Sequence, residues 1–220
     1  MPPSSVSHLS LWKKQLGRVP DYVWEQVELE TLVLADNGLA EVPGQLGALK
    51  KLRMLDLGHN QLTSVPEPLG DLEGLTDFLY LHDNRLNSLP TSLRRLTKLR
   101  YLNISKNRFA VFPEAITGMA SLIELRADDN VMTSIPDSVA RLSRLRELHL
   151  RNNRLAGLPE SVGKLRELRQ LDLRGNPLTD LPVGISKLPH LEKLDLRWVE
   201  TLVFPEWISG LEMRGCAVYC

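Results

Sequence analysis

Residues 145–165 read LRELHLRNNRLAGLPESVGKL. Leu148 and Leu150 alternate with polar residues, which is the period of a short strand with one buried face. Asn153 follows where the chain must turn, and Pro159 stands six residues later. Proline suits the first turn of a short helix, because its missing N–H is not needed there. The stretch therefore predicts a strand, a turn and a short helical segment.

The same frame recurs along the chain. Nine prolines follow one another at intervals of 23 residues, with one interval of 24, and seven asparagines each stand six residues before one of them. A fixed period of this length indicates tandem repeats that stack on one another. The residues are Pro20, Pro43, Pro66, Pro90, Pro113, Pro136, Pro159, Pro182 and Pro205, with Asn37, Asn60, Asn84, Asn107, Asn130, Asn153 and Asn176.

Each position in the frame has a physical reason. Strands from successive repeats pair into a parallel sheet, and the second half of each repeat supplies the crossover that parallel strands need. The asparagine amide can satisfy backbone groups that the turn leaves unpaired. One repeat has an extra residue within Leu75-Thr76-Asp77-Phe78, which predicts a bulge or a widened loop at the entry to the sheet.

This pattern resembles the leucine-rich-repeat family, and in particular the intracellular LPxxLxxL type found in Ras-group and bacterial repeat proteins. The resemblance implies an α/β right-handed horseshoe with a concave parallel sheet and short helical or 3₁₀ segments on the convex side. We expect one domain over residues 1–220, with atypical repeats at both ends and a capping strand within 214–220. The nine repeats begin at Val6, Leu29, Leu52, Leu75, Leu99, Leu122, Leu145, Leu168 and Leu191.

Composition narrows the class of protein. The 27 basic and 27 acidic side chains give a formal net charge of +0, which argues against a nucleic-acid or membrane-surface protein. The first eight residues lack the apolar run of a signal peptide. The chain has two cysteines, Cys216 and Cys220, both at its end. We therefore expect a cytoplasmic protein.

The variable strand positions point away from the core, onto the concave face where this family usually binds its partners. Met54, Phe78, Tyr80 and Tyr101 fall on three consecutive predicted strands, with His82 beside them. Exposed apolar and aromatic clusters of this kind mark interfaces. The alternative is that these side chains only pack across strands, as neighbours in a sheet do.

A second group on the same face is polar. It consists of Arg126, His149, Arg151, Arg174 and Arg197, which alternate with acidic residues. Asn103, between the two groups, is a further predicted contact on this face. Opposite charges on adjacent strands can neutralise one another in a ladder of salt bridges. Alternatively, the arginines form a row that recognises an acidic segment of a partner. Both interpretations stay open at this stage.

Catalytic motifs are not found in the sequence. It has no serine elbow, phosphate loop, zinc helix or paired CxxC motif. His59 and His82 have Asp56 and Asp83 nearby, but zinc needs three or four converging ligands, so solvated polar contacts are the favoured interpretation. The sequence predicts neither an enzyme nor a cofactor.

The function expected from the resemblance is binding of another protein, as a signalling scaffold or regulator that acts as a monomer. By family analogy alone, the partner is a small GTPase or its effector. The alternative is the part of an effector or ubiquitin ligase that recruits a substrate or host target.

Overall fold

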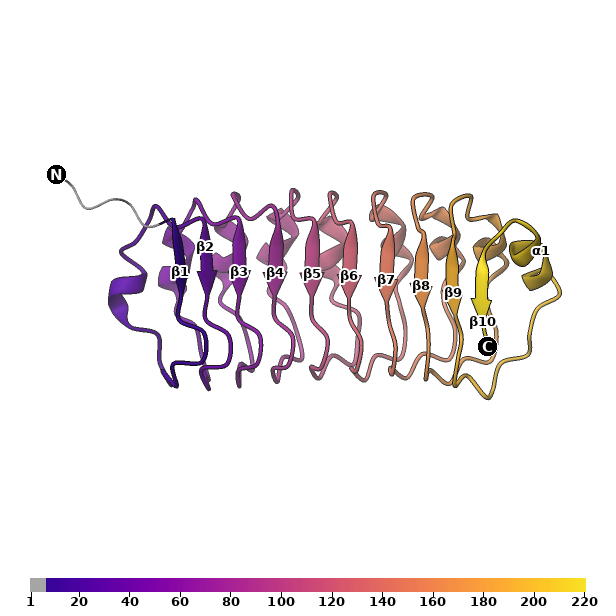
Figure 1. Cartoon of the computed structure of the whole chain (residues 1–220), viewed down its shortest axis with the longest axis horizontal. Coiled ribbons are helices and arrows are strands. Elements are labelled where there is room, and N and C mark those ends of the chain that lie inside the picture. Colours follow the sequence, from indigo (N-terminus) through magenta and orange to yellow (C-terminus); the bar gives the residue numbers. More distant parts are fainter. Residues whose placement is uncertain (1–6) are drawn as a thin grey trace.

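The computed structural model describes residues 7–220, in which ten three-residue strands form one parallel sheet in the order of the sequence (Figure 1). The start predicted at Val6 lies outside the described residues. The strands are β1 (His8–Ser10), β2 (Thr31–Val33), β3 (Met54–Asp56), β4 (Phe78–Tyr80), β5 (Tyr101–Asn103), β6 (Glu124–Arg126), β7 (Glu147–His149), β8 (Gln170–Asp172), β9 (Lys193–Asp195) and β10 (Ala217–Tyr219).

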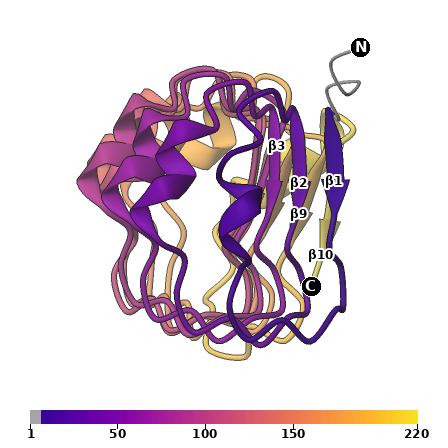
Figure 2. The same cartoon turned by 90° about the vertical axis from the view of Figure 1, so that its left-hand side faces the viewer.

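Short 3₁₀ helices occupy the side opposite the strands (Figure 2). Each follows one of the recurring prolines. The proline has an extended conformation and lies just before the helix, whereas the sequence predicted it within the first turn. The Pro159 carbonyl, for example, accepts a hydrogen bond from the Val162 N–H at 3.1 Å. The helices are η1 (Asp21–Val23), η2 (Gly44–Ala48), η3 (Glu67–Asp71), η4 (Thr91–Arg95), η5 (Glu114–Gly118), η6 (Asp137–Arg141), η7 (Glu160–Lys164) and η8 (Val183–Lys187).

The last crossover differs from the others. It contains the α-helix α1 (Ile208–Met213), and the chain then enters β10, where Ala217 pairs with Lys193 of β9. Cys216 is buried and Cys220 is exposed, and both are free thiols. Among the described residues, none of the helices has the length and apolar character needed to cross a lipid bilayer.

The recurring asparagines bind the turns of successive repeats together. The Asn153 Nδ2 donates to the carbonyls of Ala127, Leu150 and Arg151 at 3.0, 3.0 and 3.3 Å. Its Oδ1 accepts from the Met132 N–H at 3.1 Å. All seven asparagines are buried, and the hydrogen bonds confirm the role predicted for them.

The residue before each asparagine adopts a left-handed conformation. Asp36, His59, Asp83, Lys106, Asp129 and Asn152 have φ between 52° and 57°, and Gly175 has φ 64°. Aspartate, asparagine and glycine tolerate this conformation better than other residues do. The row fixes the direction in which His59 and Asp83 leave the backbone.

The extra residue of the fourth repeat is absorbed before β4. In the regular repeat that follows β5, the N–H groups of Ile123 and Glu124 share the carbonyl of Arg100. In the preceding repeat, the N–H groups of Arg100 and Tyr101 use two separate carbonyls, those of Thr76 and Asp77. The bulge therefore lies at the sheet entry, as expected, and β4 keeps its register with β3.

A single apolar core runs between the sheet and the 3₁₀ helices. It extends from Val19 to Cys216, and most of its leucines have no exposed surface. Because the strand leucines point inward, the alternate strand residues are displayed outward. The outward-facing side chains of β1 to β10, with those of the turns directly after them, are called the sheet face below.

Candidate functional site

Four apolar or aromatic side chains gather over β3, β4 and β5 and form the aromatic patch, defined as Met54, Phe78, Tyr80 and Tyr101. Met54 pairs with Phe78 in the sheet, and Phe78 pairs with Tyr101. The ring centroids lie 5.9 Å apart for Phe78 and Tyr80, 5.5 Å for Phe78 and Tyr101, and 5.1 Å for Tyr80 and Tyr101. The rings thus pack across strands and also remain at the surface, where Phe78 is 42% exposed.

The patch carries no charge at neutral pH. Burial raises the pKa of Tyr101 to about 12, and burial followed by the charge of Asp56 raises the pKa of Tyr80 as well. Both phenols therefore stay protonated and can donate a hydrogen bond to a partner. A neutral surface of stacked rings suits contact with apolar side chains.

A hollow of about 410 Å³ opens beside the patch, at the N-terminal ends of β4, β5 and β6. Phe78, Tyr101 and Ile123 supply apolar walls, and the charged residues Asp77, Arg100 and Glu124 also line it. The Asp77 carboxylate is paired with Arg53 at 3.2 Å, and that of Glu124 with Arg126 at 2.6 Å. Arg100 has no ion pair within the described part of the chain.

Sequence reasoning missed this hollow, although one signal was present. Ile123 stands directly before its strand, at a place where every other strand from β2 to β9 is preceded by a charged residue. Those residues are Glu30, Arg53, Asp77, Arg100, Arg146, Arg169 and Glu192. With isoleucine at this place, the position directly before β6 has no charged side chain next to the two aromatic rings.

The two remaining predicted residues of this half lie at the far end of the patch. The His82 ring stands edge-on to Tyr80, with centroids 5.9 Å apart, and it also contacts His59. The Asn103 Oδ1 accepts a hydrogen bond from the Ser105 N–H at 3.0 Å, which holds the turn after β5. The Asn103 side chain therefore stabilises this turn and also lies on the same strand as Tyr101.

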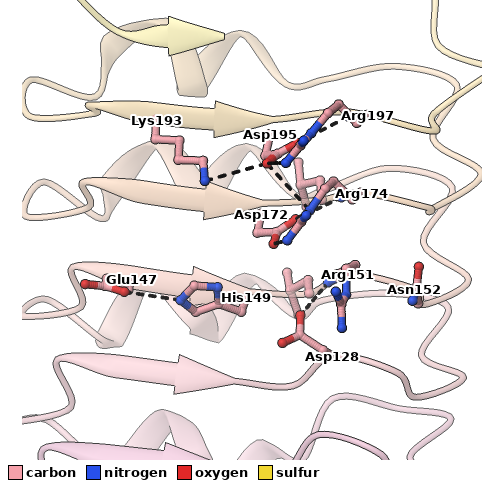
Figure 3. A network of polar contacts seen from close by, with 12 residues as sticks. Asp128, Glu147, His149, Arg151, Asn152, Asp172, Arg174, Lys193, Asp195 and Arg197 are labelled. Atoms are coloured by element: carbon pink, nitrogen blue, oxygen red, sulfur yellow. Dashed lines mark hydrogen bonds and ion pairs between the residues drawn. The ribbon is translucent and has the colours of Figure 1, made fainter. Parts of the chain in front are cut away.

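The charged residues form a separate group over β6 to β9, and Figure 3 shows most of it. This group, the charged ladder, consists of Glu124, Arg126, Asp128, Asp129, Glu147, His149, Arg151, Asp172, Arg174, Lys193, Asp195 and Arg197. The Arg174 Nε and Nη2 donate to the two carboxylate oxygens of Asp172 at 2.8 and 2.5 Å. Arg197 holds Asp195 in the same way, at 2.9 and 2.7 Å. The closest acid thus lies two residues earlier in the same repeat, and contacts between neighbouring repeats, which the sequence reasoning expected, are longer, such as the 3.5 Å pair of Arg174 with Asp195.

The rest of the ladder is paired too. The Arg126 Nε lies 2.6 Å from Glu124, the His149 Nε2 lies 3.2 Å from Glu147, and the Arg151 Nη2 lies 3.2 Å from Asp129. This geometry favours the self-neutralised interpretation over a row of free arginines. The sheet face therefore has two halves. One is apolar, with no ion pair between the side chains of the aromatic patch, and the other is polar, with most of its charges paired.

One acid of the ladder is fully buried. The Asp195 carboxylate has no exposed surface, and it lies within 4.0 Å of Arg174, Lys193 and Arg197. Burial alone would raise the pKa of Asp195, but the hydrogen bond from Arg197 and the charge of Arg174 outweigh burial, so the pKa is lowered. Asp195 is thus the cation-neutralising centre at this end of the sheet face.

We predict that Asp195→Asn lowers the free energy of unfolding by about 1–2 kcal/mol at neutral pH, because the cations around it are partly solvated. Because the folded state lowers the pKa of Asp195, its contribution is present at neutral pH and is lost as the pH falls through the folded value. Urea unfolding at several pH values tests this. Equal acid sensitivity of the variant and the parent protein would contradict it.

Three potential metal ligands also meet within the ladder. Ligand atoms of Glu124, Glu147 and His149 all lie within 4.8 Å of one another. Arg126 already donates to Glu124 there, so a cationic group is part of this cluster. Glu124 pairs with Glu147 across β6 and β7, and the contacts of Arg126 and His149 with these carboxylates reduce the repulsion between them.

Family models match most of the chain. The model described as "Leucine rich repeat" matches residues 27–86 and 77–132, and the model described as "Leucine-rich repeat region" matches residues 136–213. A search of curated proteins found no matching sequence.

Many solved structures share the fold. An LRR protein of Leptospira interrogans is 24% identical with a TM-score of 0.75 and covers 99% of this chain, which spans 66% of that one. The LRR ectodomain of the Arabidopsis thaliana receptor kinase GASSHO1/SCHENGEN3, in complex with CASPARIAN STRIP INTEGRITY FACTOR 2, is 35% identical with a TM-score of 0.75 over 87% of this chain and 24% of its own. The leucine-rich repeat domain of the type III effector XopL is 24% identical with a TM-score of 0.82, over 100% of this chain and 77% of its own. This chain thus spans less than two thirds of the length of the first two.

Proposed function

Because the chain belongs to the leucine-rich-repeat family, whose members generally act as protein-interaction modules, we propose that it binds a partner protein on its sheet face. The aromatic patch, with the hollow beside it, is the observation that carries the proposal. A stacked group of exposed rings next to a concave site is typical of the centre of an interface.

The lining of the hollow suggests what the partner presents there. An aliphatic or aromatic side chain fits between Phe78, Tyr101 and Ile123. An acidic residue next to it in the partner would meet Arg100, whose charge is not paired within the part of the chain described here. Other predicted contacts are Met54, Tyr80, His82 and Asn103, followed by the outer atoms of Arg126, His149, Arg151 and Arg174 in the charged ladder.

The fold is typically a non-enzymatic interaction scaffold, and we propose that this chain acts as one, in the cytoplasm and as a monomer. The free thiols of Cys216 and Cys220 support a reducing compartment. A small GTPase or its effector is the candidate partner, and the family resemblance is its support. The alternative role is target recruitment for an effector or ubiquitin ligase. A native gene product with a catalytic domain in addition to these residues would favour that alternative.

Photo-crosslinking tests the choice of surface. A photo-reactive residue at position 54 or position 103 on the sheet face is expected to crosslink the partner in cells. The same residue at position 137, an exposed site in η6 on the opposite side, serves as the control. Adducts to one protein from position 137 and not from positions 54 and 103 would refute the proposed surface.

A further inference from the structure

Two histidines next to the aromatic patch turn the same ring nitrogen toward one point. His59 lies in the turn after β3, and His82 lies in the turn after β4. Their Nε2 atoms are 3.2 Å apart, and their ring centroids are 4.7 Å apart at an interplanar angle of 82°. We propose that His59 and His82 coordinate one divalent transition-metal ion of the Zn²⁺ class, each through its Nε2.

The separation of the two nitrogens fits a shared metal ion. Imidazole nitrogens bind zinc at about 2.0–2.1 Å, and two ligands of a tetrahedral site at that distance are about 3.3–3.4 Å apart. The observed 3.2 Å is close to this spacing. A metal ion can therefore replace the hydrogen bond between the histidines with little movement of either ring.

The His59 ring is already oriented for coordination. Its Nδ1 lies 2.5 Å from the Oδ2 of Asp83. A carboxylate on the second nitrogen is the common support of a metal-binding histidine, because it fixes the ring and increases the basicity of the ligand nitrogen. Asp83 follows His82 in the chain, so one repeat supplies both the second ligand and the support for the first.

The His82 ring is held by packing. It lies directly over Gly58, where the Cβ of any other residue would overlap the ring, 2.8 Å from its Nδ1. The Tyr80 ring also contacts it in an edge-on arrangement, with the ring centroids 5.9 Å apart. The Nδ1 is buried and has no hydrogen-bond partner among the residues the structure describes. Only Nε2 is thus left to bind a ligand, and it faces His59.

The surroundings favour a neutral ligand and a bound cation. Burial, followed by the charge of His59, lowers the pKa of His82, which favours the neutral ring that metal binding requires. The carboxylates of Asp56 and Asp83 raise the pKa of His82, and the charge of Lys106 lowers it. Two acidic groups and one basic group therefore surround the pair.

The competing cluster of Glu124, Glu147 and His149 is less suitable, because the Glu124 Oε1 already accepts a hydrogen bond from the Arg126 Nε at 2.6 Å. Zinc takes four ligands in most protein sites, and the two histidines supply two of them. Water or donor atoms of a bound partner would complete the coordination. The metal site lies beside the aromatic patch, but metal binding itself does not depend on the proposed function.

Zinc affinity, measured by competition with a chromophoric chelator, tests the site. The experiment uses the full chain in a Cys220→Ser background, since an exposed thiol is a strong zinc ligand. We expect His59→Ala and His82→Ala each to weaken binding at least about tenfold, and Asp83→Asn to weaken it by about tenfold with both ligands retained. His149→Ala, the matched control on the same face, should leave the affinity within about twofold.

Two results would overturn the proposal. One is a parent protein that binds no zinc up to about 1 mM. The other is zinc binding that survives His59→Ala and His82→Ala, including binding that only His149→Ala removes. Circular dichroism without zinc should show that each variant is folded. If an alanine variant is not folded, glutamine is substituted at the same position in place of alanine.

Discussion

Asn84→Ala is expected to lower the free energy of unfolding by about 3 kcal/mol or more, because it leaves several buried backbone groups without partners at once. The Asn84 Nδ2 donates to the carbonyls of Leu57, Leu81 and His82 at 2.9, 3.1 and 3.2 Å. Its Oδ1 accepts from the Leu62 N–H at 3.0 Å. The side chain therefore connects the turns of two repeats.

Asn87 in the same repeat provides the matched control. It is exposed, and the structure gives its side chain no hydrogen bond among the described residues. Asn87→Ala should change the free energy of unfolding by no more than about 0.5 kcal/mol. Urea unfolding followed by circular dichroism measures both variants. Similar unfolding midpoints for the two would show that the buried asparagines do not hold the repeats together.

The repeating frame was predictable because a solenoid repeats the same local physics. Inward leucines, the turn asparagine and the proline before the crossover recur at the same place in every repeat, so their spacing is visible in the sequence without any knowledge of the contacts between repeats. Asn153 and Pro159 behave as expected for this reason, although Pro159 precedes its 3₁₀ helix and does not enter it. The bulge before β4 was predictable from the one extra residue.

The geometry of the sheet face was predictable only in part. Register alone places Phe78 next to Tyr101. The direction of a long polar side chain depends on rotamers, and register does not specify them. Arg174 and Arg197 therefore make their closest ion pairs with the acids two residues earlier, and the expected contact with a neighbouring strand remains in the 3.5 Å pair of Arg174 with Asp195.

The histidine pair was located on the right surface but was interpreted as solvated. Its convergence depends on the left-handed conformation of His59 and on the absence of a side chain at Gly58. Neither is visible in a count of potential ligands. The left-handed row itself has a partial signal, since Asp36, Asp83, Asp129 and Asn152 all occupy it.

The largest effect on function is expected from Phe78→Ala combined with Tyr80→Ala. These rings form the exposed centre of the aromatic patch, and interface centres of this kind lose about 2 kcal/mol or more on truncation. That loss corresponds to a partner affinity at least about 30-fold weaker. The melting temperature should fall by only a few degrees, about 4 °C or less, because Phe78 is substantially exposed and the stacking of the pair contributes little to folding.

The direct measurement is the dissociation constant of the purified, crosslink-identified partner for this double variant and for a matched one, Tyr22→Ala with Phe204→Ala. Tyr22 and Phe204 are 50% and 48% exposed, and neither lies on a strand. If the aromatic patch is the binding site, the Phe78/Tyr80 variant binds at least about 30-fold more weakly than the parent, and the Tyr22/Phe204 variant binds like the parent. Parent-like binding by the Phe78/Tyr80 variant would contradict the proposed site.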